Sequence, residues 1–192
     1  MTAPARTRTV APAWPLYLAA FAIAAVVAGA VGEAFSGGSL AELGIPDPGA
    51  ATTVGLPALR GVAWLLMALA TGSFLLSAFL IPPKQTQEDL NGARLTVDGH
   101  LASRTGAHAS AGIALIGLAM IPLVLSDVSG QPLKTVLFEA AAWSQALDQV
   151  ADARVWLIVA VFAAVVAAFA YTATSWWSQV WLFVGAIVVV MP

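Results

Sequence analysis

Two of the four methionines and one of the two histidines lie within apolar stretches of this sequence, where they could hold a soft metal ion. Met67 and Met120 lie in two separate apolar stretches, and His108 lies about one turn inside the stretch that contains Met120. Thioether sulfur is a preferred ligand of Cu(I), so the methionines could form one step of a path for copper ions. Methionine also fills irregular gaps in protein cores, and packing is the alternative role for both residues.

His108 has two interpretations. An ionisable residue within a membrane span is by default a candidate metal ligand or proton-transfer group. The alternative is an interfacial histidine that reaches the lipid headgroups close to Arg104. The other histidine, His100, falls in a polar stretch, where we expect a surface role. The chain has no cysteine, which excludes disulfides, thiolate metal sites and cysteine nucleophiles.

The sequence contains no motif of an enzyme that we could identify. It lacks G-x-S-x-G, H-E-x-x-H, the Walker A loop and G-x-G-x-x-G, and it has only 2 histidines. We therefore expect no catalytic activity. The net charge is −2 and no basic cluster is present, which argues against nucleic acid as a partner.

The composition is that of a membrane protein. Hydrophobic residues make up 60% of the chain and charged residues 9%, and the mean hydropathy is +0.88. A soluble domain has about a quarter of its residues charged, so the lipid bilayer is the expected surroundings of this chain.

Apolar runs predict an all-α, polytopic transmembrane helix bundle with four complete spans. A span needs about 20 apolar residues, and the four runs lie near residues 14–31, 56–81, 106–125 and 153–173. A fifth, terminal span near 177–192 is shorter, and we expect the chain to be part of a longer protein. Residues 13–192 would form one bundle, preceded by a disordered cytoplasmic tail at residues 1–12.

The spans carry signals for their ends and their neighbours. Pro57 suits the first turn of the second span, and Pro82 and Pro83 should end it. Small residues lie along one face of the second span and one face of the third, and such faces allow helices to approach closely in lipid. We expect these two faces to meet. The predicted packing residues are Gly61, Ala68, Gly72, Ser110, Ala114 and Gly117.

Residues 133–150 predict an amphipathic helix rather than a span. Apolar residues recur there at spacings of three and four, while several acidic residues interrupt the run. We expect the helix to lie in the interface or over the mouth of the bundle, and a pore helix is the alternative.

Basic residues in short loops place the N-terminus in the cytoplasm. Arg6 and Arg8 precede the first span, whereas residues 32–55 contain no Lys or Arg and should lie outside, as should residues 126–152. A cleaved signal peptide over residues 1–30 is the alternative to a retained first span. Arg60 would lie near the outer surface, where it could bind an anion, pair with an outer carboxylate or reach the headgroups.

Three stretches of the sequence resemble CopD-type copper resistance proteins of actinobacteria. They are GLPALRGVAWLLMALATGSFLLSAFLIPP in the second span, GLAMIPLVLSDVSGQPL from the third span into the next loop, and ALDQVADARVWLIVAV into the fourth. In that family the CopD-like part is typically fused ahead of a membrane domain of cytochrome c oxidase assembly (CtaG-like) proteins.

The resemblance implies an integral protein of the bacterial inner (plasma) membrane that takes part in copper transport or homeostasis. A copper ion would be its cargo, and a periplasmic copper-binding protein would be a partner. The alternative is an accessory or assembly subunit of a respiratory cytochrome oxidase complex, with no ion path of its own. A truncated remnant without function is a third interpretation.

Overall fold

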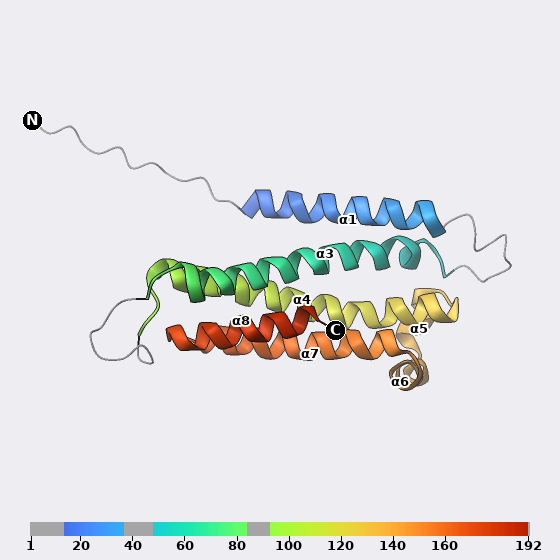
Figure 1. The fold of residues 1–192 in the computed structure, drawn as a ribbon. Helices are drawn as coiled ribbons and strands as arrows, with labels where there is room; N and C mark the ends of the chain where they lie inside the picture. The colour runs from blue at the N-terminus through green and yellow to red at the C-terminus, as the bar shows by residue number, and fades with distance from the viewer. Residues whose placement is uncertain (1–13, 37–47, 84–92, 192) are drawn as a thin grey trace, which may run out of the picture.

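The computed structural model describes residues 14–36, 48–83 and 93–191, and its long helices lie side by side in a bundle (Figure 1). These residues form seven α-helices and one short π-helix, and no strand occurs among them. The all-α prediction is therefore confirmed. The predicted tail at residues 1–12 lies outside the described residues.

Four helices are long and apolar enough to cross a membrane, as judged by length and composition. They are α1 (Trp14–Ser36), α3 (Ala50–Leu75) with its π-helical continuation η1 (Leu76–Leu80), α4 (Val97–Ser129) and α7 (Ala151–Thr172). The terminal helix α8 (Trp176–Val190) is apolar but shorter. Four complete spans and a shorter fifth helix are what the apolar runs predict.

The second span begins at Ala50, not near residue 56, so the prediction that Pro57 lies in its first turn was wrong. Gly49, at φ 91°, starts the helix, and its carbonyl accepts hydrogen bonds from the N–H groups of Thr52 and Thr53 at 2.9 and 3.1 Å. Pro57 lies inside the helix, with its ring against Gly32 of α1, where a Cβ would overlap it.

The third span starts at Val97 rather than near residue 106, and it has 33 residues. Thr96 is the N-cap, and its hydroxyl accepts a hydrogen bond from the N–H of Gly99 at 3.3 Å. His100, which we expected in a polar loop, therefore lies in the first turns of α4. At 1.5 Å per residue the helix is about 50 Å long, which exceeds the hydrocarbon core by several turns.

The predicted amphipathic helix is two helices, α5 (Leu133–Phe138) and α6 (Ala140–Gln149), because Glu139 is extended. They cover one end of the bundle, and α6 runs across its long axis (Figure 1). Val136 is buried against Ile121 and Val124 of α4. Trp143 donates its indole N–H to the carbonyl of Val136 at 3.2 Å, which ties the two helices together.

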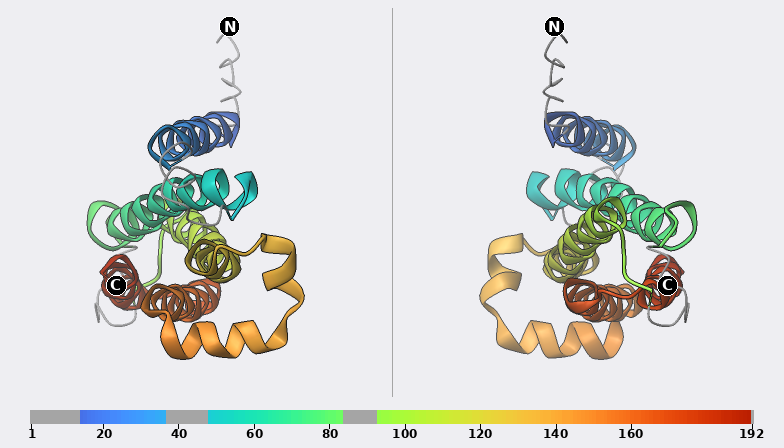
Figure 2. Two further views of the ribbon diagram at one scale, coloured as in Figure 1. Left: turned by 90° about the vertical axis from the view of Figure 1, so that its right-hand side faces the viewer. Right: turned by 90° about the vertical axis from the view of Figure 1, so that its left-hand side faces the viewer.

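Helix α4 lies at the centre of the bundle. It packs against α3 and α7, α8 packs against α3 and α7, and α1 lies on the outer side of α3 (Figure 2). The core between α3, α4, α7 and α8 is rich in alanine, which allows close approach of helix backbones. The alanines buried in this core are Ala70, Ala107, Ala109, Ala114, Ala163, Ala170, Ala173 and Ala186.

The turn between α7 and α8 is fixed to the chain that enters α4. The N–H of Leu95 donates to the carbonyl of Thr174 at 3.3 Å, and the N–H of Trp176 donates to the carbonyl of Ala93 at 2.9 Å. Helices α4 and α8 therefore start at the same end of the bundle and run in the same direction. We call this the Trp176 end, and we call the opposite one the α5–α6 end.

Candidate functional site

Met67 lies in the core, where α3, α4 and α8 meet. It is 4% exposed, and it borders a narrow gap between side chains that has no room for a water molecule. Ser110 and Ile113 of α4 line the same gap, together with Ala186 and Val189 of α8. Met67 therefore places its side chain beside the hydroxyl-bearing Ser110 in a closely packed part of the core.

Met120 is also completely buried, but it does not lie beside Met67. Helices α3 and α4 are antiparallel, with Leu66 in contact with Gly112 and Phe74 in contact with Gly106. Met67 is thus level with Gly112, and Met120 lies about eight residues, or roughly 12 Å, further along α4. The two thioethers are too far apart to share one Cu(I) ion.

His108 lies on the surface of the bundle and faces away from Met67. It is separated by roughly 200° around α4 from Ser110, which lines the gap. Its Nδ1 lies 2.7 Å from the carbonyl oxygen of Arg104, which can only accept, so Nδ1 is the donor. Its ring meets that of Tyr171 edge-on at 5.5 Å.

Arg104 completes this surface cluster, with its guanidinium 5.2 Å from the centroid of the Tyr171 ring. Its Nε also donates to Nε2 of His100 at 3.4 Å. A basic residue, two histidines and a tyrosine at one end of the bundle match the interfacial interpretation of His108 better than the interpretation as a metal ligand in the core. Over the described residues, no three His, Asp or Glu side chains are grouped to hold a metal ion.

The predicted small-residue faces do not meet as one pair. Gly61 lies against α1, where an added Cβ would be 3.0 Å from that of Ala28. Gly117 lies against α7, where a Cβ would be 2.9 Å from that of Ala160. Small residues on several sides of α3 and α4 thus allow close approach to different neighbours. Ser110 and Ala114 are buried in the bundle, as predicted for packing positions.

Ala68 and Gly72 have a different setting, because both are exposed. Among the described residues, no heavy atom outside the helix lies within 4 Å of a Cβ added at Gly72. Both residues line an open groove of about 310 Å³ over α3, between Tyr17 of α1 and Ala102 and Thr105 of α4. The described chain leaves this part of the small-residue face uncovered.

Three buried polar groups were not singled out from the sequence. Within the described residues, the hydroxyls of Thr71 and Ser103 and both amide atoms of Gln179 have no hydrogen-bond partner. Gln179 is 0% exposed and Ser103 is 1% exposed. A glutamine within an apolar helix is the one signal in the sequence that could have drawn attention to this part of the core.

Arg60 pairs with a carboxylate, which is one of the three roles expected for it. Its Nη2 lies 2.6 Å from Oδ2 of Asp152, in the first turn of α7, and both side chains are about half exposed.

The chain was compared with protein-family models, with curated proteins and with solved structures, and none of the three comparisons found a match.

Proposed function

We propose that this chain handles copper in a bacterial inner membrane, with its N-terminus in the cytoplasm, and that Met67 is a contact for Cu(I) as cargo. The resemblance to CopD-type proteins supports copper as the ion. The observation that carries the proposal is a set of polar side chains whose buried atoms have no partner among the described residues, and helical spacing places them as a row between Met67 and the Trp176 end.

The positions of these polar side chains along the bundle follow from the spacing of residues in a helix. Thr71 is one turn from Met67 on the same face of α3. Ser103 is two turns before Ser110 on α4, and Gln179 is two turns before the residues of α8 that line the gap beside Met67. Because α4 and α8 run in the same direction, Ser103 and Gln179 lie at a similar level, about 10 Å from the gap.

Polar groups that are buried without partners in a membrane protein reduce its stability, so a role in function is a reasonable explanation for them. The hydroxyl and amide oxygens of this row are weak ligands for Cu(I), so an ion that has left the thioether would pass them without being held. A single thioether binds weakly, which suits a transient contact on a path better than a storage site. A periplasmic copper-binding protein is the proposed partner that would exchange the ion.

The test is Cu(I) binding by the purified protein, measured under reducing conditions by equilibrium dialysis, which detects weak binding. We expect Met67→Leu and the double variant Met67→Leu/Met120→Leu to lose binding. Met120→Leu alone should keep it, because its thioether is roughly 12 Å from that of Met67. Met191→Leu is the matched control, since Met191 is 78% exposed. Unchanged binding in the double variant would exclude these ligands.

Transport tests the row of polar groups separately. In vesicles loaded with a Cu(I)-sensitive dye, Gln179→Leu should slow copper entry while it leaves binding at Met67 intact. The same variant should unfold at a higher temperature, because an unpartnered buried amide is replaced by an apolar side chain of similar size. Normal copper entry in vesicles with a well-folded Gln179→Leu protein would argue against a path along this row of polar side chains.

The second candidate is an accessory or assembly subunit of a respiratory oxidase complex. The open groove at Gly72 favours it, because Ala68 and Gly72 form a small-residue pair four residues apart, and a Cβ added at Gly72 would have no described atom within 4 Å. Such pairs allow a helix of another membrane protein to approach closely.

Co-purification with an oxidase complex would test this role. Gly72→Leu should fill the groove and abolish association while the thermal unfolding of the isolated chain is unchanged. Ala164→Leu is the matched control, at an exposed position on α7. A chain that always purifies alone, or association that survives Gly72→Leu, would contradict the subunit role at this face.

A further inference from the structure

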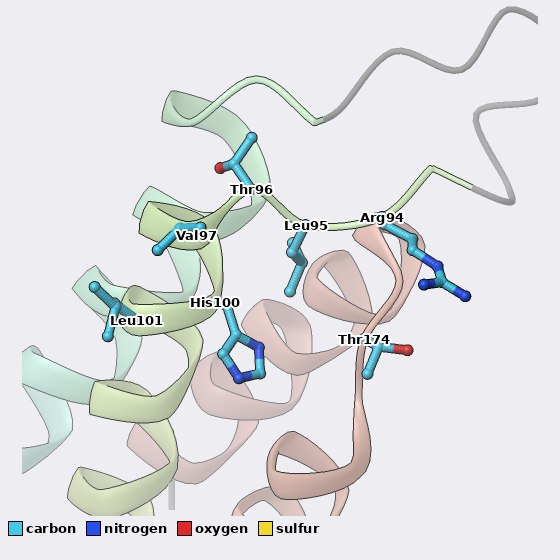
Figure 3. Close-up of a pocket in the computed structure, with 7 residues that line it drawn as sticks. All are labelled: Arg94, Leu95, Thr96, Val97, His100, Leu101 and Thr174. Atoms are coloured by element: carbon cyan, nitrogen blue, oxygen red, sulfur yellow. The ribbon is translucent and has the colours of Figure 1, made fainter.

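An open cavity of about 290 Å³, separate from the gap beside Met67 and the groove at Gly72, lies at the Trp176 end of the bundle. It lies between the start of α4 and the turn from α7 to α8 (Figure 3). Arg94 and Thr174 lie on one side of it and His100 on the other, with Leu95 between them. The hydrogen bond from Leu95 to Thr174 fixes the two sides to each other.

The polar groups that line the cavity suit an anion. Arg94 is exposed and carries a permanent positive charge with several N–H donors. Nε2 of His100 accepts from Arg104, so the Nδ1 of a neutral His100 carries the hydrogen and can donate. The ring points from α4 toward the α7–α8 turn (Figure 3). Thr174 carries a hydroxyl that points away from His100, on the side where Arg94 lies (Figure 3).

The start of α4 adds to the positive potential. The cavity includes the first turn of this 33-residue helix, where the backbone dipoles favour negative charge. Asp98 in the same turn opposes this effect, but it does not line the cavity.

Apolar side chains on the outer surface of the bundle also border the cavity. Val97 is 71% exposed and Leu101 is 60% exposed, on the side of α4 that borders the cavity. Trp177 and Trp181 of α8 are exposed in the same end of the bundle, as is typical of the border between hydrocarbon and headgroups. A ligand held here would contact both cationic donors and aliphatic side chains.

From this arrangement we propose that the cavity binds the phosphate group of an anionic phospholipid, whose acyl chains lie along Val97 and Leu101. Nδ1 of His100 donates to the phosphate from the α4 side, and Arg94, whose guanidinium points away from His100 (Figure 3), reaches it by a change of side-chain rotamer. Inorganic phosphate shares the chemistry of the headgroup but gains nothing from the apolar walls, so it should bind much more weakly.

Native mass spectrometry of the purified, delipidated full chain tests the site. Phosphatidylglycerol is added in one series, phosphatidylcholine in a second, and inorganic phosphate competes with phosphatidylglycerol in a third. We expect retention of phosphatidylglycerol above phosphatidylcholine and no displacement by millimolar phosphate. Displacement by phosphate at that concentration would overturn the lipid assignment.

Substitutions of the residues that line the cavity test whether the lipid binds there. Arg94→Gln/His100→Gln should weaken phosphatidylglycerol binding by roughly tenfold or more, as expected for the loss of charge-assisted hydrogen bonds. Arg94→Lys should restore part of the affinity in the presence of His100. Arg154→Gln is the matched control, since Arg154 is exposed at the start of α7, at the opposite end of the bundle. Equal binding by the double variant, or an equal loss in Arg154→Gln, would contradict the proposal.

Discussion

The indole N–H of Trp176 donates a hydrogen bond of 2.7 Å to the carbonyl oxygen of Ala78. The two residues are 98 positions apart, and the bond joins the first residue of α8 to the π-helical end of the second span. A π-helix pairs its backbone groups over five residues, as in the bond from Ile81 to Leu76 at 3.0 Å. Trp176 therefore fixes this widened turn, in addition to lying near the interface.

Trp176→Phe should lower the free energy of unfolding by about 1 kcal/mol, because it removes the donor to a carbonyl in a partly buried contact. Trp177→Phe is the control, since Trp177 is 46% exposed and no hydrogen bond to its indole is present among the described residues. Both variants would be unfolded by denaturant in detergent micelles. Equal stability of the two variants would show that the bond to Ala78 contributes nothing measurable.

Thr52 and Ser126 form a buried hydroxyl pair near the α5–α6 end, with their oxygens 2.7 Å apart. Ser126 donates its hydrogen to the carbonyl of Gln131 at 2.7 Å, so Thr52 must be the donor to Ser126. We expect Thr52→Val and Ser126→Ala each to destabilise the protein. The double variant should lose about 0.5–1 kcal/mol less than the two single losses together. Strict additivity in this double-mutant cycle would contradict a coupled pair.

Gly117 and Gly72 provide a matched comparison of a filled and an open helix face. A Cβ at position 117 would be 3.1 Å from the backbone carbonyl oxygen of Trp156, as well as close to Ala160. Gly117→Ala should therefore destabilise the bundle by about 1–3 kcal/mol.

Gly72→Ala should leave stability unchanged or raise it by up to about 1 kcal/mol, because alanine is the better helix former and meets no described atom. Thermal unfolding followed by circular dichroism would distinguish the two variants. Similar destabilisation by both would mean that Gly72 has a neighbour after all.

The ion pair of Arg60 and Asp152 should contribute little to stability. The side chains are 43% and 56% exposed, and water and salt screen such pairs. Arg60→Gln should lower the free energy of unfolding by less than about 1 kcal/mol, and the difference should vanish in high salt. Asp152→Asn serves as the partner control. A larger loss that persists in high salt would require a less hydrated environment than the structure has.

The sequence by itself determined that the chain is helical, that four of its helices are long and apolar enough to cross a membrane, and roughly where these helices lie. Length and apolarity of a segment decide whether it can cross a bilayer, and both are local properties of the chain. Pro82 and Pro83 also predicted the end of the second span to within a few residues, because proline cannot continue a helix. Helix starts were less accurate, because Thr96 and Gly49 begin helices in stretches too polar or too rich in glycine to resemble a span.

Only the tertiary structure decided which helix each face contacts. Lipid tails are as apolar as leucine, so an apolar pattern does not distinguish a face buried against protein from one exposed to lipid. The sequence could not show that Gly61 meets α1, that Gly117 meets α7, or that Gly72 faces an open groove. The separation of Met67 from Met120 likewise follows from the register of α3 on α4, which depends on all of their contacts at once.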